Sequence, residues 1–203
     1  EILTHIRHSE KVFIMKRLLL ILILTLSFQS LSKADDISDF EIEGMSIGDS
    51  ALDHFTKDKI QKNKNNYYKN KKFVDVEFDN VGELYDTISF NYNTGDNTYK
   101  IESISGAIFY KYNIKDCFKK RGEIVQEISD VFETTKPKNT GKIKHTGDKS
   151  GKSSLSNIEF NFENGDLIMV SCYDWSKEMP YTDHLAISFR TKKLKDFINS
   201  NPF

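Results

Sequence analysis

Two serines in the segment GMSIGDS, residues 44–50, have neighbours that could make one of them a nucleophile. Ser46 stands in the pattern Gly-x-Ser-x-Gly, which can place a serine on a sharp turn between a strand and a helix with its hydroxyl exposed. Ser50 ends the Gly-Asp-Ser that follows. A nucleophilic serine needs a base within about 3 Å. Asp174 and His184 are the candidates for that role.

Gly-Asp-Ser close to the start of a folded domain resembles the first motif of the GDSL-type esterases. The resemblance implies that Ser50 is the nucleophile, that its amide helps to form the oxyanion hole, and that an Asp lies three residues before a His. Here Asp183 and His184 are adjacent, and Tyr181 stands three residues before His184. The chain therefore departs from the family's pattern. A serine esterase is the alternative function.

A helix start is the simpler interpretation of the same segment. Ser46 and Asp49 fit the capping box Ser-x-x-Asp, in which the serine oxygen accepts from a free backbone N–H of the first turn. Apolar residues follow at helical spacing as far as Ile60. This pattern predicts a helix over residues 46–62.

Lysines are concentrated in two segments, residues 57–72 and 136–152. The first also contains Tyr67 and Tyr68, and lysines interleaved with aromatic rings can bind phosphates or anionic headgroups. If the segments are neighbours in space, they form one basic surface for an anionic ligand or an envelope component; otherwise they are ordinary solvated lysines. A nucleic-acid partner is not expected, because the net charge of the chain is −1 and not strongly positive. The candidate lysines are Lys69, Lys71, Lys72, Lys142, Lys144, Lys149 and Lys152.

The segment 174–184, DWSKEMPYTDH, places Trp175 among acidic and polar residues. An aromatic ring beside acids at a strand end could form a small-molecule or glycan pocket; alternatively, Trp175 closes the core. His54, His145 and His184 are far apart and fit no metal-binding spacing. The sequence therefore predicts neither a metal nor a cofactor.

Residues 15–34 have the organisation of a secretory signal peptide: a first methionine, two basic residues, an apolar run and small residues before a cleavage point. Cleavage is expected between Ala34 and Asp35. The alternative is an inner-membrane anchor through residues 18–31, although this run is shorter than the roughly 20 apolar residues that span a bilayer. We therefore expect a periplasmic or secreted protein with no transmembrane span after cleavage.

The remaining chain, residues 35–203, has the length of one domain, and residues 1–14 are expected to be an unstructured upstream extension. Runs of strands separated by helices predict an α+β fold with an antiparallel sheet of about six to seven strands. One long helix over 114–134 should cover the sheet, with a short N-terminal and a short C-terminal helix. The segment 135–154 is predicted to be a long loop. The expected strands lie at 73–78, 88–92, 99–101, 107–112, 158–162, 168–172 and 185–189, and the last helix at 191–199.

Cys117 and Cys172 are the two cysteines of the chain. Cys117 falls on the apolar stripe of the long helix. A three-residue loop with Gly165 in the left-handed conformation would pair Phe160 with Ile168 and place Cys172 on the same face. The cysteines are therefore expected to form a disulfide, as is common in exported proteins; the alternative is two buried thiols.

Two further resemblances concern location. Ile42 and the Gly-Met-Ser of residues 44–46, before a helix, are similar to the start of small outer-membrane assembly lipoproteins of the BamE/SmpA type. The whole chain resembles small exported proteins of AT-rich marine alphaproteobacteria, in the segments GMSIGDS, SGAIFYKYNIKDC, DKSGKS and CYDWSKEM. These resemblances imply export but no activity. The predicted function is a binding or envelope-interaction module.

Overall fold

The structure is a computed structural model, and it describes residues 36–200 except 112 and 133. The predicted upstream extension, signal peptide and cleavage point lie outside the described residues. Among residues 36–200, no helix has the length and apolar character needed to cross a membrane.

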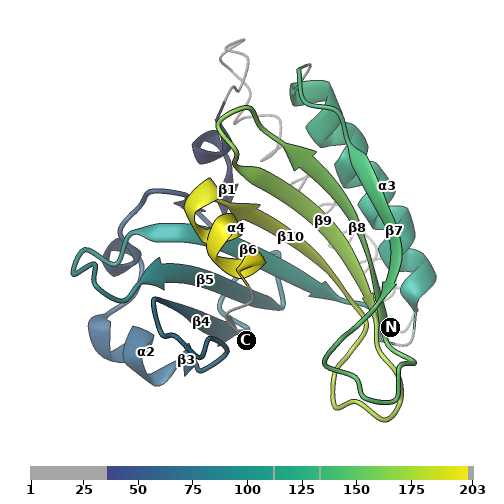
Figure 1. Cartoon of the computed structure of the whole chain (residues 1–203), viewed down its shortest axis with the longest axis horizontal. Coiled ribbons are helices and arrows are strands. Elements are labelled where there is room, and N and C mark those ends of the chain that lie inside the picture. The colour runs from purple at the N-terminus through teal and green to yellow at the C-terminus, as the bar shows by residue number, and fades with distance from the viewer. Residues whose placement is uncertain (1–35, 112, 133, 201–203) are drawn as a thin grey trace, which may run out of the picture. The chain divides into compact units, whose positions relative to one another are not determined.

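Eight strands form one antiparallel sheet in the order β3-β4-β5-β6-β10-β9-β8-β7 (Figure 1). The strands are β3 (Lys64–Asn65), β4 (Phe73–Asp79), β5 (Thr87–Asn93), β6 (Ile101–Phe109), β7 (Lys138–Lys144), β8 (Ser154–Asn161), β9 (Leu167–Asp174) and β10 (His184–Arg190). Two four-stranded meanders, β3 to β6 and β7 to β10, are joined by the pairing of β6 with β10. The α+β class is confirmed, but the predicted number of six to seven strands in the sheet is wrong.

The other elements lie around this sheet. They are the two-stranded β1 (Glu41–Ile42) and β2 (Met45–Ser46), the 3-10 helices η1 (Ile37–Asp39) and η2 (Ala51–Asp53), and the α-helices α2 (Lys57–Lys62), α3 (Ile114–Val131) and α4 (Lys192–Asn199). Helix α3 is the crossover from β6 to β7, and it packs against β9 and β10. Helix α4 follows β10 directly.

One strand, β6, replaces the two strands that were predicted on either side of Ser105 and Gly106. Gly106 lies inside the strand and does not end it. A glycine is needed at this position because the ring of Tyr85 packs directly against its backbone. A Cβ atom at Gly106 would lie 2.4 Å from the ring of Tyr85. The missing side chain therefore admits the Tyr85 ring onto the strand.

Strand β7 lies inside the segment that was predicted to be a loop. It is an edge strand, paired only with β8, and nearly all of its side chains are exposed. A strand without a buried face shows no alternation of apolar and polar residues, which is why the sequence pattern did not reveal it. Gly141, at φ +77°, lies in the irregular part of this pairing.

The continuous helix predicted over residues 46–62 is also wrong. Gly48 has a positive φ of +97° and Ser50 is extended, so the backbone cannot continue helically between them. Only half of the capping box forms, because the Asp49 carboxylate accepts from the Ser46 N–H at 2.8 Å. The Ser46 hydroxyl instead donates to the carbonyl of Phe40 at 2.9 Å. These bonds close a turn rather than begin a helix.

The face of the sheet that α3 covers is apolar. Side chains such as Phe90, Ile104 and Leu185 are fully buried there and belong to one core cluster. Helix α3 contributes Cys117, Ile124 and Ile128. The predicted apolar stripe is narrower than expected, because Phe118 is 37% exposed and lies under the guanidinium of Arg121 instead. The helix also ends at Val131, earlier than predicted.

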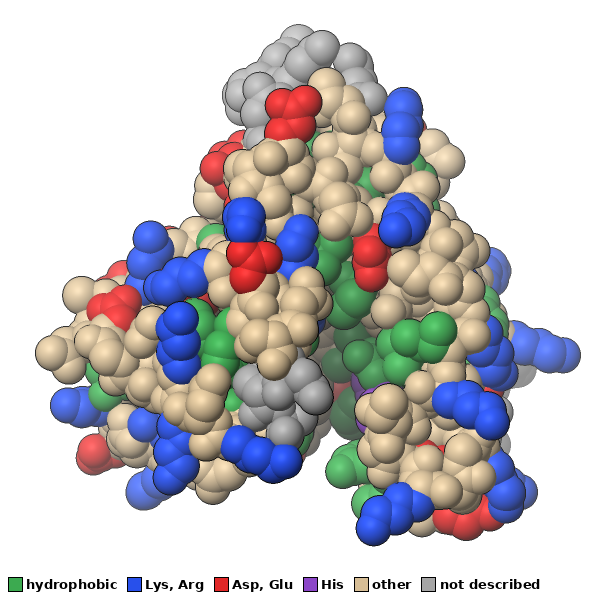
Figure 2. All heavy atoms as spheres, in the orientation of Figure 1, with side chains coloured by type: hydrophobic (Ala, Val, Ile, Leu, Met, Phe, Trp, Pro, Cys, Tyr) green, Lys and Arg blue, Asp and Glu red, His purple; other side chains and the backbone are tan. Residues whose placement is uncertain are grey.

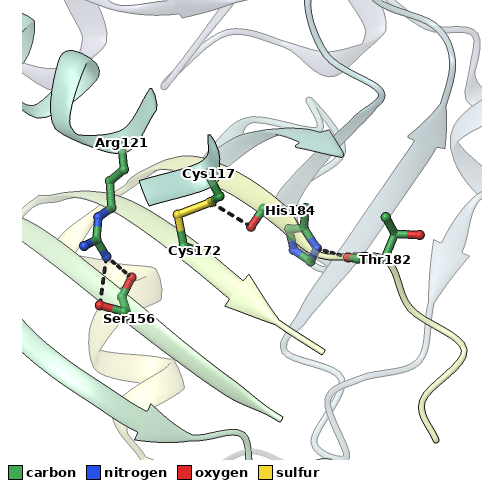
Figure 3. Close-up of a disulfide and its surroundings, with 6 residues drawn as sticks. All are labelled: Cys117, Arg121, Ser156, Cys172, Thr182 and His184. Carbon is green, nitrogen blue, oxygen red and sulfur yellow. Dashed lines mark hydrogen bonds between the residues drawn. A yellow bond between two sulfur atoms is a disulfide. The ribbon is translucent and has the colours of Figure 1, made fainter. Parts of the chain in front are cut away.

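Cys117 and Cys172 form a disulfide between α3 and β9, with Cα atoms 6.0 Å apart (Figure 3). The predicted hairpin register is present, since Phe160 pairs with Ile168 and Gly165 has φ +91°. A second link joins α3 to β8, because Nη1 of Arg121 donates to the carbonyl and hydroxyl oxygens of Ser156 at 2.7 and 2.8 Å. The helix is therefore fixed to two neighbouring strands.

We predict that the double variant Cys117→Ala/Cys172→Ala lowers the free energy of unfolding by about 4 kcal/mol, because the bond closes a long loop in the unfolded chain. The loop spans a sequence separation of 55 residues. Urea denaturation of the oxidised protein and of the variant measures the difference. An unchanged midpoint would show that the bond does not constrain the unfolded state.

Candidate functional site

The second face of the sheet is polar and has only a partial cover. Helix α4 covers part of it by packing Leu194 and Phe197 against Tyr68 and Phe73, with ring centroids 4.8–5.1 Å from Phe197. Figure 2 shows this face, with a hollow beside the helix that exposes hydrophobic and histidine side chains. We call it the polar face, and the side chains that the strand register places there define the candidate site.

A row of hydrogen-bonded side chains crosses the first half of the polar face. The carboxylate of Asp75 accepts from Asn65 at 2.9 Å and from Asn91 at 3.2 Å. The Ser103 hydroxyl donates to Asn91 at 2.7 Å. Burial raises the pKa of Asp75, and the two amide donors oppose this rise. The next residue of the row, on β10, is Arg190, which pairs with Ser103 in the register.

The row stops at Arg190, and beyond it several buried polar atoms have no hydrogen-bond partner. Within the described residues these atoms include Arg190 Nε, Ser171 Oγ and Asn157 Oδ1. Asn157 and Ser171 are directly opposite each other on β8 and β9, and the register puts Arg190 on the same face. Buried polar groups in native proteins nearly always have partners. This part of the face is therefore suited to a ligand with polar groups.

Six ring side chains form an aromatic cluster at the end of the polar face that is farther from Arg190. The rings of Tyr173 and His184 stack with centroids 4.4 Å apart. Trp175 lies 4.4 Å from His145 and 4.6 Å from Tyr181. The members of the cluster are Phe109, His145, Tyr173, Trp175, Tyr181 and His184.

Strand pairing positions three members of the cluster. His184 is the first residue of β10, and it pairs with Phe109 of β6 on one side and with Tyr173 of β9 on the other. Its Nδ1 lies 2.9 Å from the carbonyl of Thr182 (Figure 3). Burial lowers the pKa of His184. The imidazole is therefore held neutral at pH 7, with its ring face against Tyr173.

The cluster is not sealed from solvent. Tyr181 is 57% exposed and Phe109 is 46% exposed. Trp175 and Tyr181 also line a cavity of about 430 Å³, together with Lys111 and Asp183. The Trp175 Nε1 is buried and has no acceptor among the described residues. Trp175 thus lies at a surface cavity and does not close the apolar core.

The two halves of the sheet approach each other across the polar face. Tyr67 precedes β4 in the first half, and Tyr181 precedes β10 in the second. The pKa of Tyr67 is raised to about 12, first by burial and then by Glu77, Asp75 and Tyr181. The influence of Tyr181 on the pKa of Tyr67 indicates that the two tyrosines lie within electrostatic range of each other.

The structure does not bring the predicted serine-esterase residues together. The Ser50 hydroxyl donates to the carbonyl of Thr98 at 2.7 Å, and Ser50 pairs with Lys100 before the start of β6. His184 pairs with the last residue of β6. Nine residues of extended chain separate the two pairs, a distance of about 30 Å. Asp174 forms an ion pair with Lys142 at 3.1 Å, so it also lacks contact with Ser50.

The two lysine-rich segments lie at opposite edges of the sheet. Lys69, Lys71 and Lys72 precede β4, and Lys71 lines a cavity of about 180 Å³ beside Tyr68. The other segment includes β7, which is the opposite edge strand. Within the second segment, the charges of two lysines are already paired, Lys142 with Asp174 and Lys152 with Glu178. All seven candidate lysines, including Lys144 and Lys149, are exposed.

Asp148 organises the loop between β7 and β8. Its carboxylate accepts from the amides of Ser150 and Ser153 at 2.8 Å and from the Ser153 hydroxyl at 2.6 Å. The hydroxyl of Ser176, next to Trp175, donates to the same oxygen at 3.0 Å. These donors hold the pKa of Asp148 well below its usual range. The loop is thereby fixed to the segment that carries Trp175.

Sequence reasoning missed Arg190, Ser171, Asn157 and Tyr173. Each is a polar or aromatic residue on one face of a strand, and the sequence pattern assigned these residues no role. The signal that could have found them is Arg190 itself, because it is a charged residue at the end of a mostly apolar strand.

No family model, curated protein or solved structure matches this chain. Across residues 36–200, apart from 112 and 133, no group of three or more His, Cys, Asp or Glu side chains is arranged to hold a metal ion.

We predict that Asp148→Asn accelerates amide hydrogen exchange at Ser150 and Ser153, because the neutral amide is a weaker acceptor and offers one oxygen fewer. The exchange rates of both segments, 148–153 and 174–178, are measured by mass spectrometry. Asp174→Asn is the matched control, since its carboxylate makes only an exposed ion pair. Equal exchange in both variants would show that Asp148 does not fix the loop.

Burial lowers the pKa of His145 and of His184 from the ordinary value of 6.5. The unfolded chain therefore binds protons more readily than the folded chain. The contribution of these histidines to the free energy of unfolding is complete above pH 6.5, and it is lost as the pH falls toward the lower pKa values of the folded state. Urea midpoints between pH 8 and pH 5 should show this loss. The loss should be smaller in His184→Gln and unchanged in His54→Gln, a histidine outside the cluster. A rise in stability on acidification would contradict the shifts.

Proposed function

We propose that this chain is an exported binding protein that holds a small, ring-bearing molecule on the polar face of its sheet. The observation that carries the proposal is the half-exposed aromatic cluster, in which Tyr173 stacks with Trp175 and His184 while Tyr181 and Phe109 are largely exposed. Clustered rings beside a few polar groups are typical of small-molecule sites.

The geometry supports recognition by stacking. Tyr173 and Trp175 are nearly parallel, with an interplanar angle of 13° and centroids 6.0 Å apart. Exposed, rigid ring faces bind sugars and planar rings with little loss of side-chain entropy. The unpartnered Nε1–H of Trp175 adds a directional donor at the same place. The expected ligand therefore has a ring and an acceptor oxygen or nitrogen.

The scaffold supports the same proposal because it holds the cluster rigidly. Three cluster residues lie on paired strands, and the disulfide fixes β9 to α3 directly beneath this region. The Sγ atom of Cys117 lies 3.5 Å from the carbonyl of His184 (Figure 3). Binding residues on packed strands are positioned more precisely than residues on loops.

The disulfide also favours export. Such bonds persist in oxidising compartments such as the periplasm or the extracellular space. This agrees with the signal peptide expected at residues 15–34. We propose that the protein binds its ligand in the cell envelope or outside the cell.

Trp175 is the sole tryptophan of the chain, so its fluorescence reports directly on the aromatic cluster. We predict a saturable change in emission when the protein is titrated with at least one member of a panel of oligosaccharides, nucleosides and aromatic carboxylates. Tyr181→Ala should weaken that ligand's binding about tenfold, which is the effect of losing one stacked ring.

Phe118→Ala is the matched control, because Phe118 is an exposed ring on α3, outside the cluster. Its affinity should equal that of the wild type. Affinities that are the same in Tyr181→Ala, Phe118→Ala and wild type would show that the cluster is not the binding site. No emission change with any compound of the panel would count against a ring-binding function.

A further inference from the structure

Arg190 is a partly buried cation on the polar face, and it forms no ion pair with another described residue. It lies on β10 between Ser103 of β6 and Leu167 of β9. Its Nε is buried and has no hydrogen-bond partner in the described part of the chain. The other arginine there, Arg121, is bonded to two oxygens of Ser156. Arg190 is therefore unusual, because taking a charge out of water without compensation destabilises a fold.

The groups around Arg190 leave its charge uncompensated. Burial lowers its pKa, and Tyr173, Tyr68 and Glu159 oppose that shift in this order. Glu159 is the one carboxylate among these three groups, but it forms no ion pair with Arg190. The six ion pairs of the described chain all join other residues. An arginine keeps its charge under all ordinary conditions. The site therefore contains a fixed positive charge with free donor capacity.

Ser171 is a second possible donor on the same face, since it pairs with Ala186, four positions before Arg190 on β10. Ser171 is completely buried, and its hydroxyl has no partner in the described residues. A hydroxyl can donate to an anion, and a guanidinium can donate two parallel bonds to a carboxylate or a phosphate. Asn157 lies opposite Ser171, and its unpartnered atom is the acceptor Oδ1, which suits a donor group elsewhere on the ligand and not the anion itself. Arg190 and Ser171 therefore offer donors to an anionic ligand at two points of the polar face.

Tyr173 connects Arg190 to the aromatic cluster. Its ring stacks on His184 at 4.4 Å. Tyr173 and Arg190 lie on the same face of the sheet, and the positive charge of Arg190 opposes the rise that burial causes in the pKa of the Tyr173 hydroxyl. One ligand could thus lie along the face with its ring on the cluster and its charged end at Arg190.

We propose that Arg190 binds an anionic group, a carboxylate or a phosphate, on the ligand whose ring stacks on the aromatic cluster. This proposal rests on the proposed binding function and specifies the ligand class, an acidic ring compound. Asp75 does not occupy the site, because its carboxylate is held by Asn65 and Asn91.

The test compares the melting temperature of the wild type and of Arg190→Met in chloride, acetate and phosphate buffers of equal ionic strength. We expect phosphate or acetate to raise the melting temperature of the wild type by about 3–6 °C, the shift that an anion at ten times its Kd gives. Arg190→Met should lose this rise. In chloride it should melt above the wild type, because an unpaired, partly buried charge has been replaced by an apolar chain.

Arg121→Met is the matched control, since it removes an arginine whose hydrogen bonds are structural. It should melt below the wild type and keep the anion-dependent rise. A rise with phosphate alone identifies a phosphate site, and a rise with acetate as well identifies a carboxylate-tolerant site. An equal anion response in wild type and Arg190→Met overturns the proposal, as does a lower melting temperature of Arg190→Met in chloride.

The outcome separates the two proposals. An anion response that depends on Arg190, without any ligand response of Trp175, would retain the anion site and reject the stacking function. A ring ligand that binds wild type and Arg190→Met equally would retain the stacking function and reject the anion site.

Discussion

The pairing of β6 with β10 is the interaction on which the rest of the structure depends. Seven residue pairs, from His184 opposite Phe109 to Arg190 opposite Ser103, join two meanders that would otherwise be two separate sheets. Because side chains alternate along strands, this register decides which residues share a face. It places the aromatic cluster at one end of the polar face and Arg190 at the other. A shift by one residue would send Arg190 into the apolar core.

The two faces of this sheet contribute in opposite ways to stability. The face under α3 is a continuous apolar core, tied to the helix by the disulfide. The polar face contains buried Asn, Ser and Asp side chains, some of them without partners. Such groups destabilise a fold unless something binds them. A protein can retain them because the apolar face supplies the stability, and functional sites often persist at the expense of stability.

The sequence predicted what depends on local pattern. The long helix and the hairpin with its left-handed Gly165 were correct because their signals lie within about 20 residues. Strand β7 was missed because an edge strand needs no buried face, and the helix over 46–62 was wrong because Gly48 and Ser50 turn the backbone. The pairing of β6 with β10 joins residues about 80 positions apart and has no local signal.

The candidate site was predictable only in part. The segment 174–184 was recognised as a possible pocket, and the structure places Trp175 and His184 in the aromatic cluster. Tyr173 and Arg190 were not recognised, because polar residues alternate along a strand in the same way whether they face open solvent or a hollow. Curling of the sheet decides between these cases, and it is a property of the whole sheet.

The central claim is that the polar face binds a ligand through atoms that lack protein partners. A high-resolution crystal structure of the protein, purified from its exported form, tests it most directly. The account predicts electron density for a bound molecule that accepts hydrogen bonds from Arg190 Nε and Ser171 Oγ, with acceptor atoms within about 3 Å of each. Direct hydrogen bonds between Arg190 and Glu159, with Ser171 and Asn157 bonded to each other and the hollow filled by side chains, would contradict it.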